Sequence, residues 1–131
     1  MLISIDHHSG VPVYRQIIDQ IKFYVASGLL GPGEEIPSTR TLSSQLGVNP
    51  MTVSKAFGYL EVEGIVERRR GRPLTVRPMT QKDVENTKLE QLAEGLRPVV
   101  TLSRQLGLNK AQILKVLREL LDERQEEEGS S

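Results

Sequence analysis

The sequence predicts a mainly α-helical chain that carries one small β-hairpin. Three observations lead to this prediction. Apolar residues recur at helical spacing in several stretches, two short helical stretches are separated by a glycine turn within 38–55, and an arginine-rich hairpin pattern follows at 65–78. The composition changes at residue 78, so we predict one domain at 1–78 and a second, wholly helical region at 79–131.

The composition limits what the chain can be. Of its 131 residues, 37% are hydrophobic and only 4% are aromatic, so the core must be aliphatic and modest in size. The absence of Cys excludes disulfides, a thiolate metal site and a thiol nucleophile. No apolar run approaches the roughly 18 residues of a membrane span, and the first residues lack a signal-peptide pattern. We therefore expect a soluble, cytoplasmic protein without membrane contact.

The zero net charge of the chain hides an asymmetry. Residues 1–78 hold 9 Lys and Arg against 7 Asp and Glu, whereas residues 79–131 hold 8 against 10. The two regions thus carry +2 and −2, and the chain is no general polycation. Affinity for a nucleic acid would have to come from the local placement of charge.

Two elements are predicted before the glycine turn. Apolar and polar residues alternate over 2–6, which predicts a short strand. Pro12 begins the first long helix, in which apolar residues recur at helical spacing until Gly28. Ile36 is expected to add a strand to a small sheet, because Pro37 biases it away from the helical conformation.

Residues 38–55 show the pattern of a helix-turn-helix. Ser38 is suited to cap the first helix, because its hydroxyl can accept a hydrogen bond from an unpaired amide of the first turn. Gly47 tolerates the left-handed conformation that ends a helix. Asn49 is expected to cap the second helix, with Pro50 at its first position, where no amide is needed. In such a motif the second helix lies in the major groove of DNA.

The second helix of this motif presents a face that suits DNA. Its apolar residues fall on one side at helical spacing: Val53, Ala56, Phe57 and Leu60. Met51 and Lys55 point the opposite way, Thr52 and Ser54 flank them, and no acid precedes Glu61. Small, polar and basic side chains can lie beside phosphates and bases. The alternative is a plain two-helix hairpin inside an all-α core.

The hairpin predicted at 65–78 is rich in arginine. Its charged residues include a single acid, Glu67, and five arginines: Arg68, Arg69, Arg70, Arg72 and Arg77. The alternative explanation is that the charges merely protect an edge strand from aggregation, but five arginines exceed what that protection requires. We interpret the hairpin as a wing with its turn near Gly71, whose guanidinium groups contact phosphates or enter a minor groove.

Two further helices are predicted after residue 78. The first begins with a capping pair, Thr80 and Asp83, and the second begins at Lys110. Residues 80–125 have broad apolar faces but are too few for an independent core. We expect two such hairpins to associate in a homodimer as a helical bundle, the alternative being packing onto the chain's own first helix. The acidic tail at 126–131 is expected to fray.

A nine-residue segment occurs twice. Thr41–Asn49 recurs as Thr101–Asn109 with seven identical positions, so Gly107 is expected to break the helix as Gly47 does. The helix after the second copy carries Glu119 among other acids, which would repel phosphate. The second copy therefore predicts a helical hairpin and no second DNA-reading unit.

Several blocks occur in order and at matching spacing along the chain. They are Pro12–Ile17, Gly28–Gly33, Ile36–Arg40, Leu46–Ala56, Leu60–Glu61 and Gly64–Ile65, with Gly71 in the hairpin. Together these blocks resemble the winged-helix domain of the GntR family of bacterial transcriptional regulators. The short, wholly helical remainder resembles the YtrA-type branch of that family, and the resemblance covers nearly the whole chain.

The resemblance implies a repressor-type regulator that binds double-stranded DNA at an inverted-repeat operator as a homodimer. We expect no catalysis, no metal and no cofactor, and an unidentified small-molecule effector is left open as a further partner. The DNA-binding positions that it implies are Ser38, Thr39, Arg40, Asn49, Pro50, Met51, Thr52, Ser54, Lys55, Arg70, Gly71 and Arg72. Several relatives have Arg where this chain has Pro50 and Ser54, so the wing arginines are expected to compensate for a weaker recognition helix.

Two other classes of function remain to be weighed. A winged-helix module that binds another protein would share the fold, but it would not need five wing arginines. An enzyme is disfavoured, because the only His residues are the adjacent His7 and His8 and no phosphate-cradling glycine loop is present. Asp6 beside this pair could suggest metal ligands, but a site needs three or four, so we interpret these residues as a polar loop.

Overall fold

The computed structural model describes residues 1–129, with side chains up to residue 123. The chain divides into two compact units, Met1–Gln91 and Leu92–Ser131, each described here by itself. The domain boundary predicted at residue 78 stays a prediction. The acidic tail at 126–131 is predicted to fray, but the structure continues the last helix through Gly129, and residues 130–131 lie outside the described residues.

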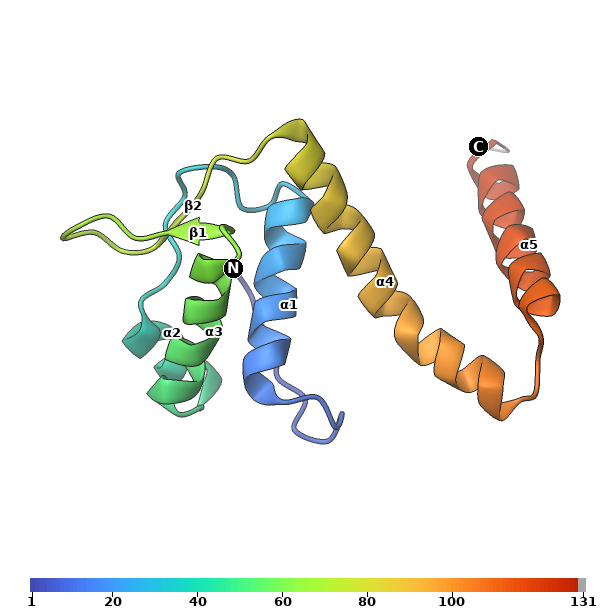
Figure 1. Ribbon diagram of the computed structural model, residues 1–131, viewed down its shortest axis with the longest axis horizontal. Coiled ribbons are helices and arrows are strands. Elements are labelled where there is room, and N and C mark those ends of the chain that lie inside the picture. Colours follow the sequence, from blue (N-terminus) through green and yellow to red (C-terminus); the bar gives the residue numbers. More distant parts are fainter. Residues whose placement is uncertain (130–131) are drawn as a thin grey trace. The chain divides into compact units, whose positions relative to one another are not determined.

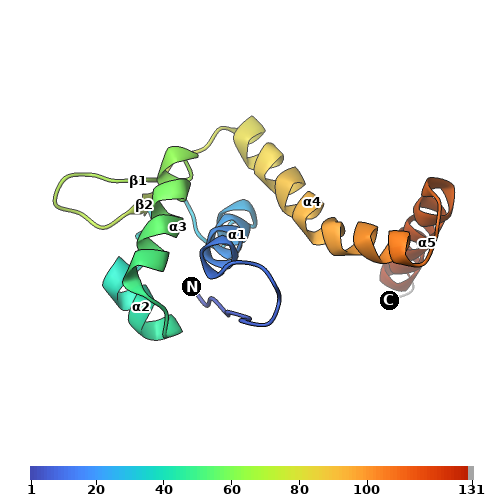
Figure 2. The same ribbon diagram turned by 60° about the horizontal axis from the view of Figure 1, so that its bottom comes forward.

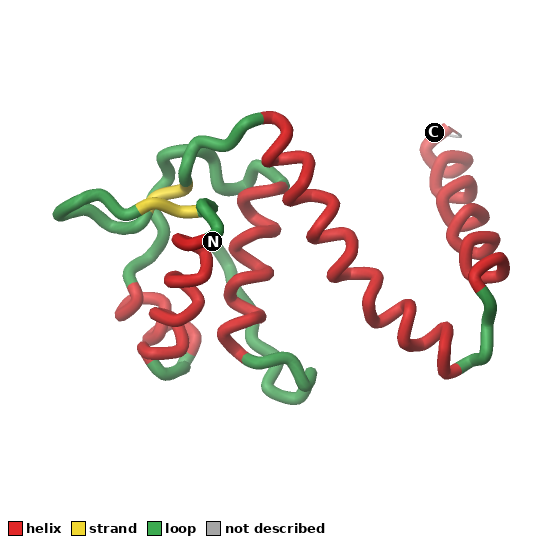
Figure 3. Tube along the Cα trace, in the orientation of Figure 1, coloured by secondary structure: helices red, strands yellow, loops and turns green. Residues whose placement is uncertain are grey.

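The element order confirms the predicted fold class. The elements are α1 (Val13–Ala26), α2 (Thr39–Leu46), α3 (Pro50–Val62), β1 (Val66–Glu67), β2 (Thr75–Val76), α4 (Gln81–Gln105) and α5 (Lys110–Gly129) (Figure 1). The two short strands pair antiparallel, with Val66 opposite Val76, at the base of a long loop (Figure 3). The described chain is thus mainly helical with one small β-hairpin.

The core of the first unit forms where α1, α2 and α3 meet the hairpin. Its most buried side chains are aliphatic, as the composition requires: Ile17, Ile18, Ile21, Ile36, Leu42, Val53, Leu60, Val66 and Val76. The predicted apolar side of α3 is confirmed, because Val53, Ala56, Phe57 and Leu60 are at most 3% exposed. Figures 1 and 2 both show α3 between α2 and α1.

Residues 2–6 do not form the short strand that the alternation predicts. Three side chains of α1, spaced four residues apart, each bond the N–H and the C=O of alternate residues: Tyr24 with Leu2, Gln20 with Ser4, and Gln16 with Asp6. Four helical residues rise about 6 Å and two extended residues about 6.6 Å, so the two repeats match. The prediction was wrong because the partner of this extended segment is a helix and not another strand.

The strand expected at Ile36 is reduced to a single bridge between Glu35 and Thr75. The Ile36 N–H donates to the Leu74 carbonyl at 2.8 Å, which attaches this link to β2. The next residue, Pro37, has no N–H to continue such a ladder.

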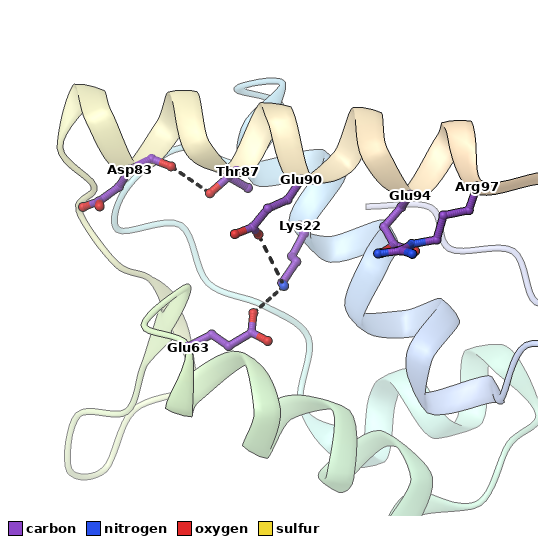
Figure 4. A network of polar contacts seen from close by, with 7 residues as sticks. All are labelled: Lys22, Glu63, Asp83, Thr87, Glu90, Glu94 and Arg97. Carbon is purple, nitrogen blue, oxygen red and sulfur yellow. Dashed lines mark hydrogen bonds and ion pairs between the residues drawn. The ribbon is translucent and has the colours of Figure 1, made fainter. Parts of the chain in front are cut away.

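The first turns of α4 belong to the first unit. The predicted capping pair is confirmed, because the Asp83 N–H donates to the Thr80 hydroxyl oxygen at 3.1 Å. Lys22 of α1 forms an ion pair with Glu63, the residue that ends α3 (Figure 4). The same ammonium lies 3.9 Å from the Glu90 carboxylate on α4.

The second unit contains the predicted helix break between α4 and α5. Gly107 has a φ of +69°, and Asn109 and Gln112 exchange two capping hydrogen bonds of 2.9 Å. In the described part of the chain, no helix is long and apolar enough to cross a membrane.

Candidate nucleic-acid interface

The helix-turn-helix predicted at 38–55 is formed by α2, its turn and α3. The Ser38 hydroxyl accepts the Thr41 N–H at 3.1 Å, which caps α2. Gly47 ends α2 with a φ of +65°, and the Asn49 side chain accepts the Met51 N–H at 2.8 Å, which caps α3. These features confirm the predicted start and end of α2 and the predicted start of α3.

Ser43 closes the turn between α2 and α3, a role that our sequence reasoning missed. Its side chain is buried, and its hydroxyl donates to the Val48 carbonyl at 2.6 Å. The Val48 N–H donates in return to the Ser43 carbonyl at 3.2 Å. The signal in the sequence is a Ser directly after the buried Leu42, on the inner side of α2.

The outer face of α3 carries short or uncharged side chains through its first turn and a half. Met51 is 78% exposed, Pro50 and Ser54 are exposed, and Thr52 is half-buried. The Asn49 amide nitrogen has no partner among the described residues, because only its oxygen serves as the cap. This face therefore offers apolar contact, hydroxyl groups and one free amide donor.

Lys55 lies at the seam between α3 and α1. Its ammonium nitrogen is 4.0 Å from the centre of the Tyr14 ring. Tyr14 in turn stacks on Tyr59, with ring centres 5.7 Å apart and planes inclined by 19°. The sequence reasoning identified Lys55 but neither tyrosine. The only local signal is the spacing of four between Lys55 and Tyr59.

The start of α2 carries one arginine that forms no ion pair with the described residues. Arg40 is exposed and has no ion pair among the described residues, whereas Thr39 is half-buried. The Ser38 hydroxyl donates its proton to the Thr41 hydroxyl at 2.9 Å.

The tip of the hairpin turns at Gly71, as predicted. Gly71 has a φ of +74°, and the Arg72 N–H donates to the Arg69 carbonyl at 3.0 Å. In Figures 1 and 2 the hairpin extends on the side of α2 and away from α1. Arg70, Gly71 and Arg72 are exposed at this tip.

The structure separates the wing arginines into two groups. Arg68 pairs with Glu61 at 3.3 Å, and Arg69 pairs with Glu67 at 3.1 Å. Of the five wing arginines, Arg70, Arg72 and Arg77 form no ion pair with the described residues. The free charge of the wing tip therefore comes from the two arginines beside Gly71.

The adjacent His7 and His8 lie in the exposed loop before α1. The His8 N–H donates to the Asp6 carboxylate at 2.9 Å, which is a local turn contact. Among the residues that the structure describes, no three His, Asp or Glu side chains gather as metal ligands would.

Comparison with known proteins identifies the family to which this chain is similar. Residues 13–76 match the family described as bacterial regulatory proteins, gntR family. The chain is 33% identical to the HTH-type transcriptional repressor YtrA of Bacillus subtilis (strain 168) over 119 residues, which are 91% of this chain and 92% of that protein.

Solved structures give the same result. YtrA from Sulfolobus acidocaldarius, a GntR-family transcription factor, is 34% identical with a TM-score of 0.57, over 92% of this chain and 97% of that one. A transcriptional antiterminator from Listeria monocytogenes EGD-e is 33% identical with a TM-score of 0.68, over 92% and 90%. The chain belongs to the GntR family of bacterial regulatory proteins and is a winged helix-turn-helix transcriptional regulator.

Proposed function

We propose that this regulator represses transcription by binding, as a homodimer, to an inverted-repeat operator in double-stranded DNA. The observation that supports this most is the α2–α3 pair, in which both helices are capped and the outer side of α3 carries no acid before Glu61. A helix of this kind fits the major groove. The proposal assigns no effector and no catalytic step.

The proposed DNA contacts are divided between two kinds of side chain. The recognition helix supplies Met51 and the methyl group of Thr52 for apolar contact with thymine methyl groups, and Asn49 for a hydrogen bond. Arg40 and the wing-tip arginines supply charge for phosphates and groove edges. The full proposed contact set is Ser38, Thr39, Arg40, Asn49, Pro50, Met51, Thr52, Ser54, Lys55, Arg70, Gly71 and Arg72.

Homodimerisation is proposed through residues 80–125. Many large apolar side chains of this region are exposed in the single chain: Leu89, Leu92, Val99, Val100, Leu102, Leu106, Leu108, Leu114, Val116, Leu117, Leu120 and Leu121. Exposed apolar surface on this scale marks an interaction site. A symmetric dimer would also present two recognition helices to two half-sites.

The decisive experiment is the selection of bound duplexes from a random pool by the full chain. We expect enrichment of two inverted half-sites whose centres are about 34 Å, or a multiple of that distance, apart. Binding should weaken steeply with salt, because contacts of Lys and Arg with phosphates release counterions. Failure to enrich any duplex, or enrichment of a single isolated half-site, would contradict the proposal.

Arginine variants test the proposed contacts on the selected duplex. Arg40→Ala should cost about 1–3 kcal/mol and relax the preference at one base position. Arg70→Ala and Arg72→Ala should each weaken binding to most sequences and reduce the salt slope by about 1. Arg68→Ala is the matched control, because Glu61 already pairs with that arginine, and its effect on affinity should be smaller.

A further inference from the structure

We propose that Tyr14 is a positioning residue for DNA binding. It holds the Lys55 ammonium at the seam between α1 and α3, from which the ammonium contacts a phosphate at the edge of the recognition helix. This inference rests on the proposed function and extends the DNA interface onto α1.

The seam is built by three side chains from two helices. Lys55 and Tyr59 are four residues apart on α3 and therefore on the same side of that helix. Tyr14 of α1 stacks on Tyr59 and also receives the Lys55 ammonium over its ring, at 4.0 Å. An ammonium over an aromatic face is held by the negative quadrupole of the ring. The long Lys55 side chain is thereby held in one place before it meets DNA.

The held ammonium keeps the donors that a phosphate needs. An ammonium group has three N–H donors, and a ring face beneath it occupies only one side of the group. Lys55 is also an exposed residue, so solvent and a DNA phosphate can reach its side chain. The side chain can contact a phosphate oxygen without leaving the ring.

The position of the seam fits the geometry of a groove. A helix in the major groove has a phosphate backbone along each of its two sides, and contacts to both fix its register. Since α3 lies between α2 and α1 (Figures 1 and 2), we assign Arg40 to the phosphate backbone on the α2 side and Lys55 to the phosphate backbone on the α1 side. Lys55 thus acts on the phosphate backbone and not on a base edge.

The test measures affinity against salt concentration for the selected duplex, with single and double variants of the full chain. Lys55→Met should reduce the salt slope by about 0.9, the value for one phosphate contact. Tyr14→Leu should weaken binding about two- to five-fold and also flatten the slope, because the ammonium is no longer held. Tyr14→Phe keeps the ring and should bind like the original chain.

The double variant separates positioning from a merely structural role. If Tyr14 acts through Lys55, then Tyr14→Leu should have no further effect in the Lys55→Met background. An equal loss in both backgrounds, or a loss with Tyr14→Phe, would overturn the inference. Thermal unfolding of each variant checks that the fold persists.

Two matched controls lie outside the seam. Phe23→Leu makes the same kind of change at an exposed aromatic residue of α1, whereas Tyr14 is half-buried, and Lys82→Met removes an exposed charge at the start of α4. Both should leave affinity and slope unchanged. If the original chain binds no duplex, the proposed function fails. If it binds and Tyr14→Leu changes nothing, only the role of Tyr14 fails.

Discussion

Two serines at equivalent positions of the repeated segment make different hydrogen bonds. The Ser43 hydroxyl crosses the turn to the Val48 carbonyl at 2.6 Å, whereas the Ser103 hydroxyl bonds the Val99 carbonyl of its own helix at 2.7 Å. The first bond joins α2 to the turn that leads into α3, and the second lies within one helix. A nearly identical local sequence thus gives two different side-chain roles at the residue scale.

Replacing Ser43 should therefore cost more than replacing Ser103. Ser43→Ala leaves the half-buried Val48 carbonyl without its side-chain partner and should lower the free energy of unfolding by about 1–3 kcal/mol. Ser103→Ala should cost much less, because the helix itself still engages the Val99 carbonyl. Urea unfolding followed by circular dichroism measures both, and equal costs would contradict the assigned role.

Glycines at two positions should respond in opposite directions to alanine. Gly58 lies inside α3 with no atom within 4 Å of an added Cβ, so Gly58→Ala should stabilise the fold by about 0.5–1 kcal/mol. Gly47 has a φ of +65°, so Gly47→Ala should destabilise by about 1–2 kcal/mol. Thermal unfolding in parallel measures the two shifts, and a loss of stability in Gly58→Ala would show an unrecognised constraint on α3.

At the scale of the elements, Lys22 of α1 links this helix to the end of α3 and to α4. Its side chain is only 12% exposed, and it contacts Glu63 after α3 as well as the more distant Glu90 on α4. A partly buried cation of this kind needs a partner. Glu63 should stabilise the Lys22 ammonium more than Glu90 does, because the Glu63 carboxylate is closer and less exposed.

Neutralising the two carboxylates should therefore have unequal effects. Glu63→Gln should lower the free energy of unfolding by about 1–2 kcal/mol, because it removes a charge-assisted hydrogen bond. Glu90→Gln should change it by less than about 1 kcal/mol, the range for exposed ion pairs. Urea unfolding at low and at 1 M salt measures both. A larger loss for Glu90→Gln would show that α4 and not α3 is the main partner of Lys22.

The whole molecule depends on its exposed apolar helices for the proposed dimer. Leu117 and Leu121 are four residues apart on α5 and expose 39% and 60% of their surface. Replacing both with Glu places charge on one helix face and should give monomers in sedimentation experiments. Binding to one half-site should persist while binding to the paired operator falls.

The matched control at this scale is Glu119→Gln, an exposed acid on the same helix, which should leave the oligomeric state unchanged. A double leucine variant that still sediments as a dimer would contradict a role for this face in dimerisation. An original chain that sediments as a monomer would contradict dimerisation itself.

Much of the fold could be predicted because its signals are local. The helix ends depend on caps and glycines within a few residues of each other, such as Ser38 with Thr41 and Asn49 with Met51. The buried side of α3 follows from helical spacing alone. The DNA-contacting residues carried over from the family remain predictions, which the arginine and seam variants above test.

The sequence by itself determined the helices and the hairpin, the helix-turn-helix with its caps, and the family, but not the extended segments at 2–6 and Ile36. Only the tertiary structure decided which groups those elements bring together. It attached residues 2–6 to side chains of α1 and placed the Lys55 ammonium over the Tyr14 ring. It also paired Arg68 with Glu61 and Arg69 with Glu67, whereas Arg70 and Arg72 at the wing tip form no ion pair with the described residues. These contacts join residues that are distant in the chain or on different elements, and no local pattern encodes them, because they depend on how the helices and the hairpin pack.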